Sequence, residues 1–230
     1  MKSRFRVRDF GCSGLATLIL VLYSCAARPP HENGNFLKSD LVEIIRLDST
    51  IRLDIRYATT ENFTGRTVYS EARAFLQRPA AEALVRANAD LKSLGYGLMV
   101  YDGYRPWRIT KFFWDITPPE KRKFVADPKK GSRHNRGCAV DLTLYELATG
   151  KQVEMTSGYD EMTERAYPDY TGGSARQREM RDLLRSTMEK NGFTVYPVEW
   201  WHFDFKGWES YRVQNISFSE IPTTQKENVR

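Results

Sequence analysis

The chain has 230 residues, of which 41% are hydrophobic and 28% are charged, a balance typical of one globular domain or at most two. Its formal net charge is +6, and much of this excess lies in the first ten residues, where Lys2, Arg4, Arg6 and Arg8 accompany a single acid. The remaining charge is mild, and no run of basic residues is interleaved with aromatics. The composition therefore argues against a nucleic-acid partner.

Residues 1–24 have the pattern of a signal peptide. Basic residues precede an apolar run, Leu15–Tyr23, that is shorter than the roughly 20 residues of a membrane-spanning helix. The sequence Leu22-Tyr23-Ser24-Cys25 resembles a bacterial lipoprotein signal, which predicts lipidation of Cys25. We expect an exported lipoprotein on the periplasmic side of a bacterial membrane. A secretory signal that releases a soluble periplasmic protein, or an uncleaved anchor, is the alternative.

The first half of the mature chain predicts a tether, a strand and a helix. Residues 25–40 are polar and contain Pro and Gly, as in a tether. Apolar alternation begins at Leu41 and predicts a strand with Ile51, Leu53, Ile55 and Tyr57 on one face. Residues 79–94 predict a helix, with Pro79 in its first turn and Gly95 at its end. Its apolar stripe comprises Leu84, Ala87, Leu91 and Leu94.

Shorter elements follow. Residues 98–101 predict a strand, residues 107–114 a short helix and residues 117–131 a loop. A second long helix is expected over residues 174–190, with Gly192 as its stop.

The C-terminal part predicts strands over residues 193–196 and 201–205, which flank Pro197. From residue 214 the sequence is polar, which predicts a tail over residues 214–230 outside a domain at 41–213. Strands and helices alternate without regular βαβ spacing. The expected fold is a single α+β domain with a mainly antiparallel sheet flanked by helices.

Two of the three histidines have an acidic residue close by in the sequence. His134 precedes Asp141, and Glu199 precedes His202. Two imidazoles and one carboxylate supply three ligands to a divalent metal and leave a fourth position for water. The second carboxylate can then act as a general base. This set is typical of a catalytic zinc site, because structural zinc sites are usually closed by thiolates.

Residues 138–144 predict a strand with one apolar face. Cys138, Val140 and Leu142 would lie on the core side, and Asp141 would face a cleft. Cys12 lies in the signal and Cys25 is the lipidation site, so Cys138 has no disulfide partner and is expected to be a small buried hydrophobe.

The geometry of the two histidine segments leaves alternatives open. Gly137 permits a sharp turn that would bring His134 back to Asp141, but a surface loop with an unrelated His and Asp has the same sequence. In a regular strand Glu199 and His202 would face opposite ways. A bend after Pro197, with the strand starting near Trp200, would let both reach the metal. An aromatic core strand with a buried histidine is the alternative.

Four segments resemble the VanX-type D-alanyl-D-alanine dipeptidases of peptidase family M15. They are the stretch Tyr57–Gly65, the turn Asp102–Pro106, the stretch from His134 to Tyr145, and Glu199-Trp200-Trp201-His202. The resemblance implies a cleft on the sheet that holds one Zn²⁺ per chain. Its ligands would be His134, Asp141 and His202, and Glu199 would activate the water.

The resemblance also implies how substrate is bound. Arg105 would stabilise the oxyanion, and Asp160 would contact the free ammonium of a dipeptide. Ser132 is a candidate for binding the substrate carboxylate, and Tyr57 for lining the pocket. The alternatives are an arginine that ties a turn to a carboxylate, and a solvated acidic loop around Asp160.

The implied function is zinc-dependent hydrolysis of the dipeptide D-Ala-D-Ala to free D-alanine. For an exported enzyme this would serve cell-wall peptide recycling. A DD-carboxypeptidase that trims peptidoglycan stem peptides, or a non-catalytic zinc-containing cell-wall binding lipoprotein, are the alternatives. The sequence leaves the oligomeric state open.

Overall fold

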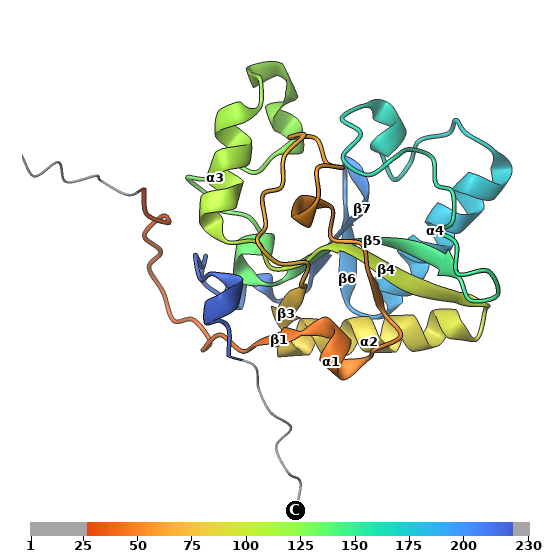
Figure 1. Ribbon diagram of the computed structural model, residues 1–230, viewed down its shortest axis with the longest axis horizontal. Coiled ribbons are helices and arrows are strands. Elements are labelled where there is room, and N and C mark those ends of the chain that lie inside the picture. The colour runs from red at the N-terminus through yellow and green to blue at the C-terminus, as the bar shows by residue number, and fades with distance from the viewer. Residues whose placement is uncertain (1–26, 223–230) are drawn as a thin grey trace, which may run out of the picture.

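The computed structural model describes residues 27–222 and is built around a five-stranded sheet in the order β2-β4-β5-β7-β6 (Figure 1). The strand β2 runs parallel to β4, and the other neighbouring pairs in this sheet are antiparallel. The expected α+β fold with a mainly antiparallel sheet is confirmed. The five strands are β2 (Arg52–Leu53), β4 (Tyr96–Asp102), β5 (Ala139–Glu146), β6 (Phe193–Tyr196) and β7 (Glu199–Phe205).

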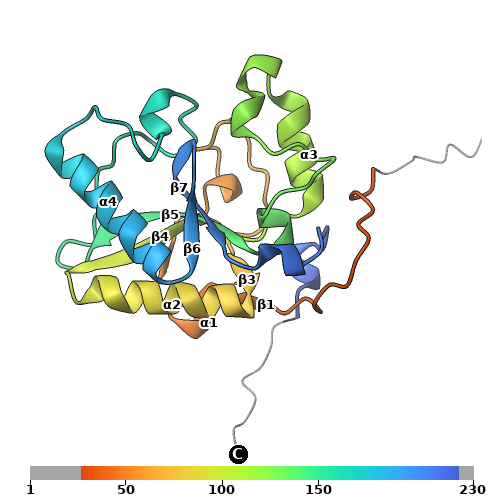
Figure 2. The same ribbon diagram turned by 180° about the vertical axis from the view of Figure 1, so that it is seen from behind.

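Two long helices, α2 (Arg78–Lys92) and α4 (Ala175–Lys190), pack against each other and against the sheet (Figure 2). The helix α2 has proline in its first turn and buries a row of alanines, which lets its backbone lie close to the sheet. The helix α4 begins with a capping box formed by Ser174 and Gln177. These helices cover one face of the sheet. The polar side chains of the central strands therefore lie on the opposite face.

The remaining elements lie around this core. A two-stranded sheet pairs β1 (Leu41–Glu43) with β3 (Phe75–Gln77), and the short helix α1 (Ile44–Leu47) follows β1 directly. The helix α3 (Trp107–Ile116) follows the turn after β4. Within residues 27–222 no helix is long and apolar enough to cross a lipid bilayer.

Alternation that begins at Leu41 predicts a strand with Ile51, Leu53, Ile55 and Tyr57 on one face, and most of this strand is wrong. The segment is divided into β1, α1 and β2, and Tyr57 lies in a 3₁₀ turn. The side chain of Asp48 accepts a hydrogen bond from the backbone of Thr50 at 2.9 Å, which forms a local turn and interrupts the strand. Ile51 and Tyr57 are nevertheless buried, so the spacing of the apolar residues correctly predicts which side chains are buried but not that the backbone is extended.

The stripe expected on the first helix is also wrong at its last member. Leu94 is 56% exposed, because α2 ends at Lys92 and the chain turns away toward Gly95. The other expected members of the stripe, Leu84, Ala87 and Leu91, are fully buried.

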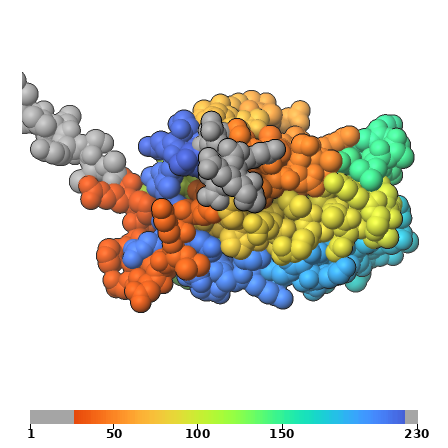
Figure 3. All heavy atoms as spheres, turned by 90° about the horizontal axis from the view of Figure 1, so that it is seen from below, coloured from red at the N-terminus to blue at the C-terminus, as the bar shows by residue number. Residues whose placement is uncertain are grey.

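Both expected domain boundaries lie inside the packed structure. Phe218 and Ile221 are buried in the core, so residues 214–221 do not form an outlying tail. On the N-terminal side, the carboxylate of Glu32 forms an ion pair with Arg136 and accepts a hydrogen bond from the backbone of Val213 at 2.7 Å. The N-terminal segment therefore packs against the C-terminal one at one end of the molecule (Figure 3). The expected signal peptide (residues 1–24), the expected lipidation site Cys25 and residues 223–230 lie outside the described residues.

Candidate active site

The centre of the site is a pair of neighbouring strands. Asp141 of β5 is paired directly with His202 of β7, so both side chains leave the same face of the sheet. Val140 and Leu142, on the opposite side of β5, are fully buried in the core. The predicted alternation, with Asp141 toward the cleft, is confirmed.

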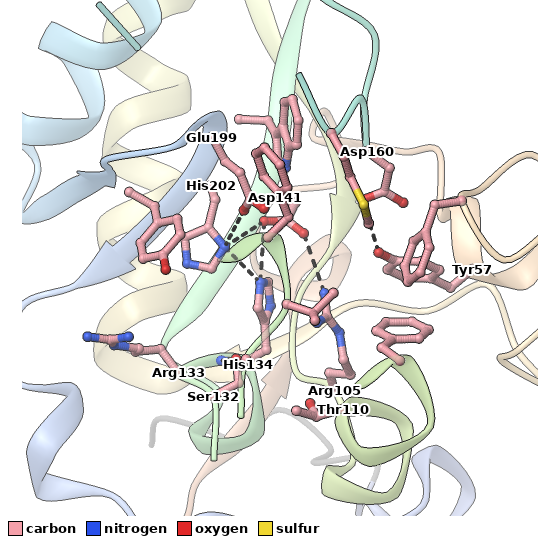
Figure 4. Close-up of a pocket in the computed structure, with 18 of the residues that line it drawn as sticks. Tyr57, Arg105, Thr110, Ser132, Arg133, His134, Asp141, Asp160, Glu199 and His202 are labelled. Atoms are coloured by element: carbon pink, nitrogen blue, oxygen red, sulfur yellow. Dashed lines mark hydrogen bonds and ion pairs between the residues drawn. The ribbon is translucent and has the colours of Figure 1, made fainter. Parts of the chain in front are cut away.

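His134 reaches these two residues from the turn that precedes β5. It begins a short 3₁₀ turn that ends at Gly137, whose φ of +72° is the left-handed conformation that glycine adopts without strain. The turn reverses the chain, and the His134 ring meets the face of the sheet that carries Asp141 and His202 (Figure 4). The reading of His134 as part of an unrelated surface loop is wrong, since the residue is 1% exposed.

The three side chains converge on one point. His134 Nε2 lies 3.1 Å from His202 Nδ1 and 3.3 Å from Asp141 Oδ1, and His202 Nδ1 lies 3.1 Å from Asp141 Oδ1. The three residues form a group that could hold a metal ion. Two imidazole nitrogens and one carboxylate oxygen form the ligand set of a catalytic zinc site with an open position.

The surroundings of the three side chains fit a metal as well. Gly103 O lies 2.7 Å from His134 Nδ1, and Asp204 Oδ1 lies 2.9 Å from His202 Nε2. Each acceptor takes the proton of one ring nitrogen and leaves the lone pair of the other nitrogen facing the site. Asp141 Oδ1 is buried and accepts no hydrogen bond from the described residues, while Oδ2 accepts one from Tyr159 at 3.0 Å. A buried carboxylate oxygen without a donor fits a cation.

The charges of the site favour a cation. Burial raises the pKa of Asp141, but His134 and His202 lower it further, and the net shift is to below the ordinary value. Burial lowers the pKa of His202, whereas Asp204 and Asp141 raise it to about 10. The buried acids thus create a negative potential at the point where the ligand atoms meet.

Glu199 reaches the same point through an irregularity in the sheet. The pairing of β6 with β7 shifts between Val195 and Tyr196, so that Tyr196 pairs with Glu199. This bulge breaks the alternation and brings Glu199 Oε2 to 3.7 Å from His202 Nδ1. The expected bend is confirmed, although the strand begins at Glu199 and not near Trp200. Burial raises the pKa of Glu199 to about 8.

Arg105 enters from the turn after β4 and binds two carboxylates. The pairing of β4 with β5 shifts before Asp102, which places Asp102 opposite Asp141. Asp102 Oδ2 accepts a hydrogen bond from Arg105 Nε at 2.9 Å, and Arg105 Nη2 lies 3.6 Å from Asp141 Oδ2. Tyr69 donates a further hydrogen bond to Asp102 at 2.9 Å. Arg105 therefore does tie its turn to a carboxylate, as the structural alternative predicts. The same contacts with Asp102 also direct its guanidinium toward Asp141.

Asp160 lies on one side of the ligands, within the same pocket (Figure 4). Its backbone φ is +59°, in the left-handed region that few residues other than glycine enter and that aspartate enters more often than most. Tyr57 donates a hydrogen bond to Oδ1 at 3.1 Å, while Oδ2 is buried without a partner among the described residues. Burial raises the pKa of Asp160 to about 7. A freely solvated acidic loop is not what the structure contains.

The other predicted residues lie as follows. Ser132 is buried in the pocket, and its hydroxyl oxygen accepts a hydrogen bond from His134 N at 3.2 Å. Cys138 is fully buried, and burial raises the pKa of its thiol to about 12, so it remains a neutral thiol in the core.

Sequence reasoning gave no role to three residues that orient the ligands. Asp102 was visible only as part of a motif, and Asp204 only as a second polar residue on the His202 face of its strand. Tyr159 is next to Asp160 in the chain, but no local pattern predicts its hydrogen bond to Asp141. The contacts of Asp102 and Tyr159 depend on strand pairing and loop packing, which short motifs do not encode. Asp204 lies two residues after His202 on the same face of β7, so its position follows from alternation.

Comparisons with known proteins cover the whole site. A family model of peptidase family M15, described as D-ala-D-ala dipeptidase, matches residues 38–221. A D-alanyl-D-alanine dipeptidase of Escherichia coli is 32% identical over 181 residues, which are 79% of this chain and 92% of the relative. A second one, from Enterococcus faecium, is 37% identical over 171 residues, which are 66% of this chain and 85% of the relative. One from Streptomyces coelicolor is 36% identical, with 74% and 93% covered.

We expect the purified protein to bind one Zn²⁺ per chain and His202→Ala to lose it. Asp204→Asn should weaken zinc binding by about 10- to 100-fold, because the amide is uncharged and can present an N–H to the His202 ring, which would favour the wrong tautomer. Metal analysis after dialysis and titration against a chelator measure both effects. Cys138→Ala is the matched control and should retain full zinc. Loss of zinc from folded Cys138→Ala, or full zinc in His202→Ala, would contradict the assigned ligands.

Proposed function

Because the chain belongs to peptidase family M15, whose D-Ala-D-Ala dipeptidase model matches residues 38–221, we propose that it hydrolyses D-Ala-D-Ala to free D-alanine with Zn²⁺ as its metal. The relatives that match over most of the chain are named D-alanyl-D-alanine dipeptidases. These names favour the dipeptidase over a carboxypeptidase. The single observation that carries catalysis is the Glu199 carboxylate. Its side chain is only 13% exposed, and its Oε2 lies 3.7 Å from His202 Nδ1 without being needed as a metal ligand.

Each charged residue of the site has a separate part in the proposed reaction. His134, Asp141 and His202 would hold the zinc, which when bound acts as a Lewis acid that polarises the scissile carbonyl and lowers the pKa of a water ligand. Glu199 takes a proton from the attacking water and delivers it to the leaving amine. Arg105 stabilises the negative charge that develops on the carbonyl oxygen. A protein that only binds cell-wall peptides would need neither Glu199 nor Arg105.

Recognition of the free N-terminus is assigned to Asp160. Its unpartnered Oδ2 is a hydrogen-bond acceptor inside the pocket, and the substrate ammonium is a donor of matching charge. Tyr57 fixes the carboxylate through its hydrogen bond to Oδ1. An ammonium contact of this kind favours a dipeptide over a longer stem peptide, which has no charged nitrogen at that position.

We further propose that the protein is exported and attached to a membrane through lipidated Cys25. The basic and apolar pattern of residues 1–24 supports this location. An exported enzyme cannot act on the cytoplasmic D-Ala-D-Ala that enters cell-wall precursors. Its substrate would be D-Ala-D-Ala released from peptidoglycan, which is then recycled as D-alanine.

Glu199→Gln should reduce kcat by about 100- to 10,000-fold while zinc content stays complete, because the amide cannot accept the proton of the attacking water. Steady-state hydrolysis of D-Ala-D-Ala, with metal analysis of the same samples, measures this. Glu209→Gln, an exposed-surface change outside the pocket, is the control and should leave kcat unchanged. Wild-type turnover by zinc-loaded Glu199→Gln would exclude Glu199 as the base.

Asp160 predicts a pH-dependent preference for free over N-acetylated D-Ala-D-Ala. With a pKa of about 7, its carboxyl is charged above this pH and neutral below it, so the preference should fall as the pH decreases through 7. Asp160→Asn should lower kcat/KM for the free dipeptide by about 10- to 150-fold, the range for a charge-assisted hydrogen bond, and make the preference independent of pH. Because titration of Glu199 changes kcat/KM for both substrates equally, the ratio of the two kcat/KM values does not depend on it. Equal rates for both substrates in the wild type would remove the dipeptidase proposal.

Cys25→Ala tests the location. The full-length wild type should fractionate with membranes and incorporate labelled fatty acid, whereas the variant should do neither. A wild-type protein that stayed in the cytoplasm would contradict export and return the enzyme to the precursor pool.

A further inference from the structure

A dipeptide has a charge at each end, and the roles assigned so far provide a counter-charge at only one of them. Asp160 matches the ammonium, but Ser132, at the other side of the ligands, is neutral. Resting on the proposed function, we propose that Arg133 binds the free carboxylate of the substrate and that the cleft recognises both charged ends of a dipeptide.

The position of Arg133 suits this role. The residue lies between Ser132 and His134 in the chain and lines the same pocket as the metal ligands. In Figure 4 Arg133 and Asp160 lie on opposite sides of the His134–Asp141–His202 group. A peptide bond held at the metal would therefore have a carboxylate of the protein toward one end and a guanidinium toward the other.

The guanidinium of Arg133 has hydrogen-bond donors to spare. Its Nε is buried and donates no hydrogen bond among the described residues, although Asp204 Oδ2 lies 3.5 Å away. The other oxygen of Asp204 already serves His202. Arg133 also lies over the Trp208 ring, 4.6 Å from its centroid, which holds the plane of the guanidinium without using its N–H groups. The side chain is 40% exposed, so a substrate can reach it.

The second cation that lines this pocket is not available for the task. Arg105 is committed to Asp102 by two contacts, of Nε at 2.9 Å and of Nη2 at 2.8 Å, and faces the metal ligands. Asp102 thereby holds the Arg105 guanidinium beside the position that the carbonyl oxygen of the substrate would take in the proposed mechanism. Arg133 is thus the lining cation with donors left for a carboxylate, which a guanidinium binds through two parallel hydrogen bonds.

The test compares D-Ala-D-Ala with its C-terminal amide, which lacks the negative charge. The Arg133→Gln variant should raise KM for D-Ala-D-Ala by about 10- to 150-fold with little change in kcat, and should change KM for the amide much less. Arg133→Lys should recover part of the loss, since it restores the charge without the paired donors. Arg185→Gln, on the exposed side of α4, is the matched control and should behave as the wild type.

A second measurement does not depend on turnover. D-Ala-D-Ala is titrated calorimetrically into zinc-loaded Glu199→Gln and into the double variant with Arg133→Gln, and Kd should rise by a similar factor. Equal losses for the acid and the amide would assign Arg133 a structural role and overturn the proposal, as would an unchanged Kd. If the wild type hydrolyses neither substrate, the proposed function fails, while the change in Kd still decides whether Arg133 binds the carboxylate. Complete zinc content in each variant shows that a change in Kd does not come from loss of the metal.

Discussion

Asp141 is a buried carboxylate in the middle of the sheet, and the rest of the site is arranged around its two oxygens. Oδ1 meets His134 and His202 at 3.3 and 3.1 Å and has no hydrogen-bond donor among the described residues. Oδ2 accepts from Tyr159 and lies 3.6 Å from the Arg105 guanidinium. A buried charge is costly unless it is paired, so the metal on one side and the donors on the other are what permit a carboxylate at this depth. The apolar face of the same strand, packed in the core, fixes its direction.

Two irregularities in the sheet place Glu199, the proposed general base, and Asp102, which holds Arg105. A regular strand sends alternate residues to opposite faces, so it cannot present neighbours three apart to one ion. The shift between β6 and β7 brings Glu199 to the face of His202, and the shift between β4 and β5 sets Asp102 opposite Asp141. Both shifts occur at strand ends next to the pocket. The regular pairing of the sheet therefore makes the site rigid, and the two register shifts set the positions of Glu199 and Asp102.

Local patterns in the sequence were sufficient where a physical rule acts over a few residues. Alternation separated Asp141 from the core face of its strand, and the spacing of Glu199 and His202 required a bend. The same rules failed where distant segments decide the outcome. The spacing from Leu41 to Tyr57 recorded burial without showing that Asp48 turns the chain, and the polar composition after residue 214 hid the packing of Phe218 and Ile221. Asp102 and Tyr159 act on the site from another strand and from a loop, and pairing between distant segments is not written in any short motif. Asp204 lies two residues after His202 on the same strand, where alternation shows that the two share a face but not that they form a hydrogen bond.

Charges of opposite sign lie on the two sides of the ligands, so the two ends of the cleft are electrostatically different. On one side, desolvation of the Asp160 carboxyl raises its pKa to about 7, and on the other Arg133 lies over Trp208 with its Nε unsatisfied among the described residues. Neither group is paired well by the protein alone, and both become paired if a zwitterion lies between them. On the Asp160 side this matching is selective, because a carboxylate withdrawn from water costs more when it has no partner than the same charge in water. A substrate that lacks either terminal charge leaves one of them unmatched, so the two ends of the cleft restrict the enzyme to short peptides with both termini free.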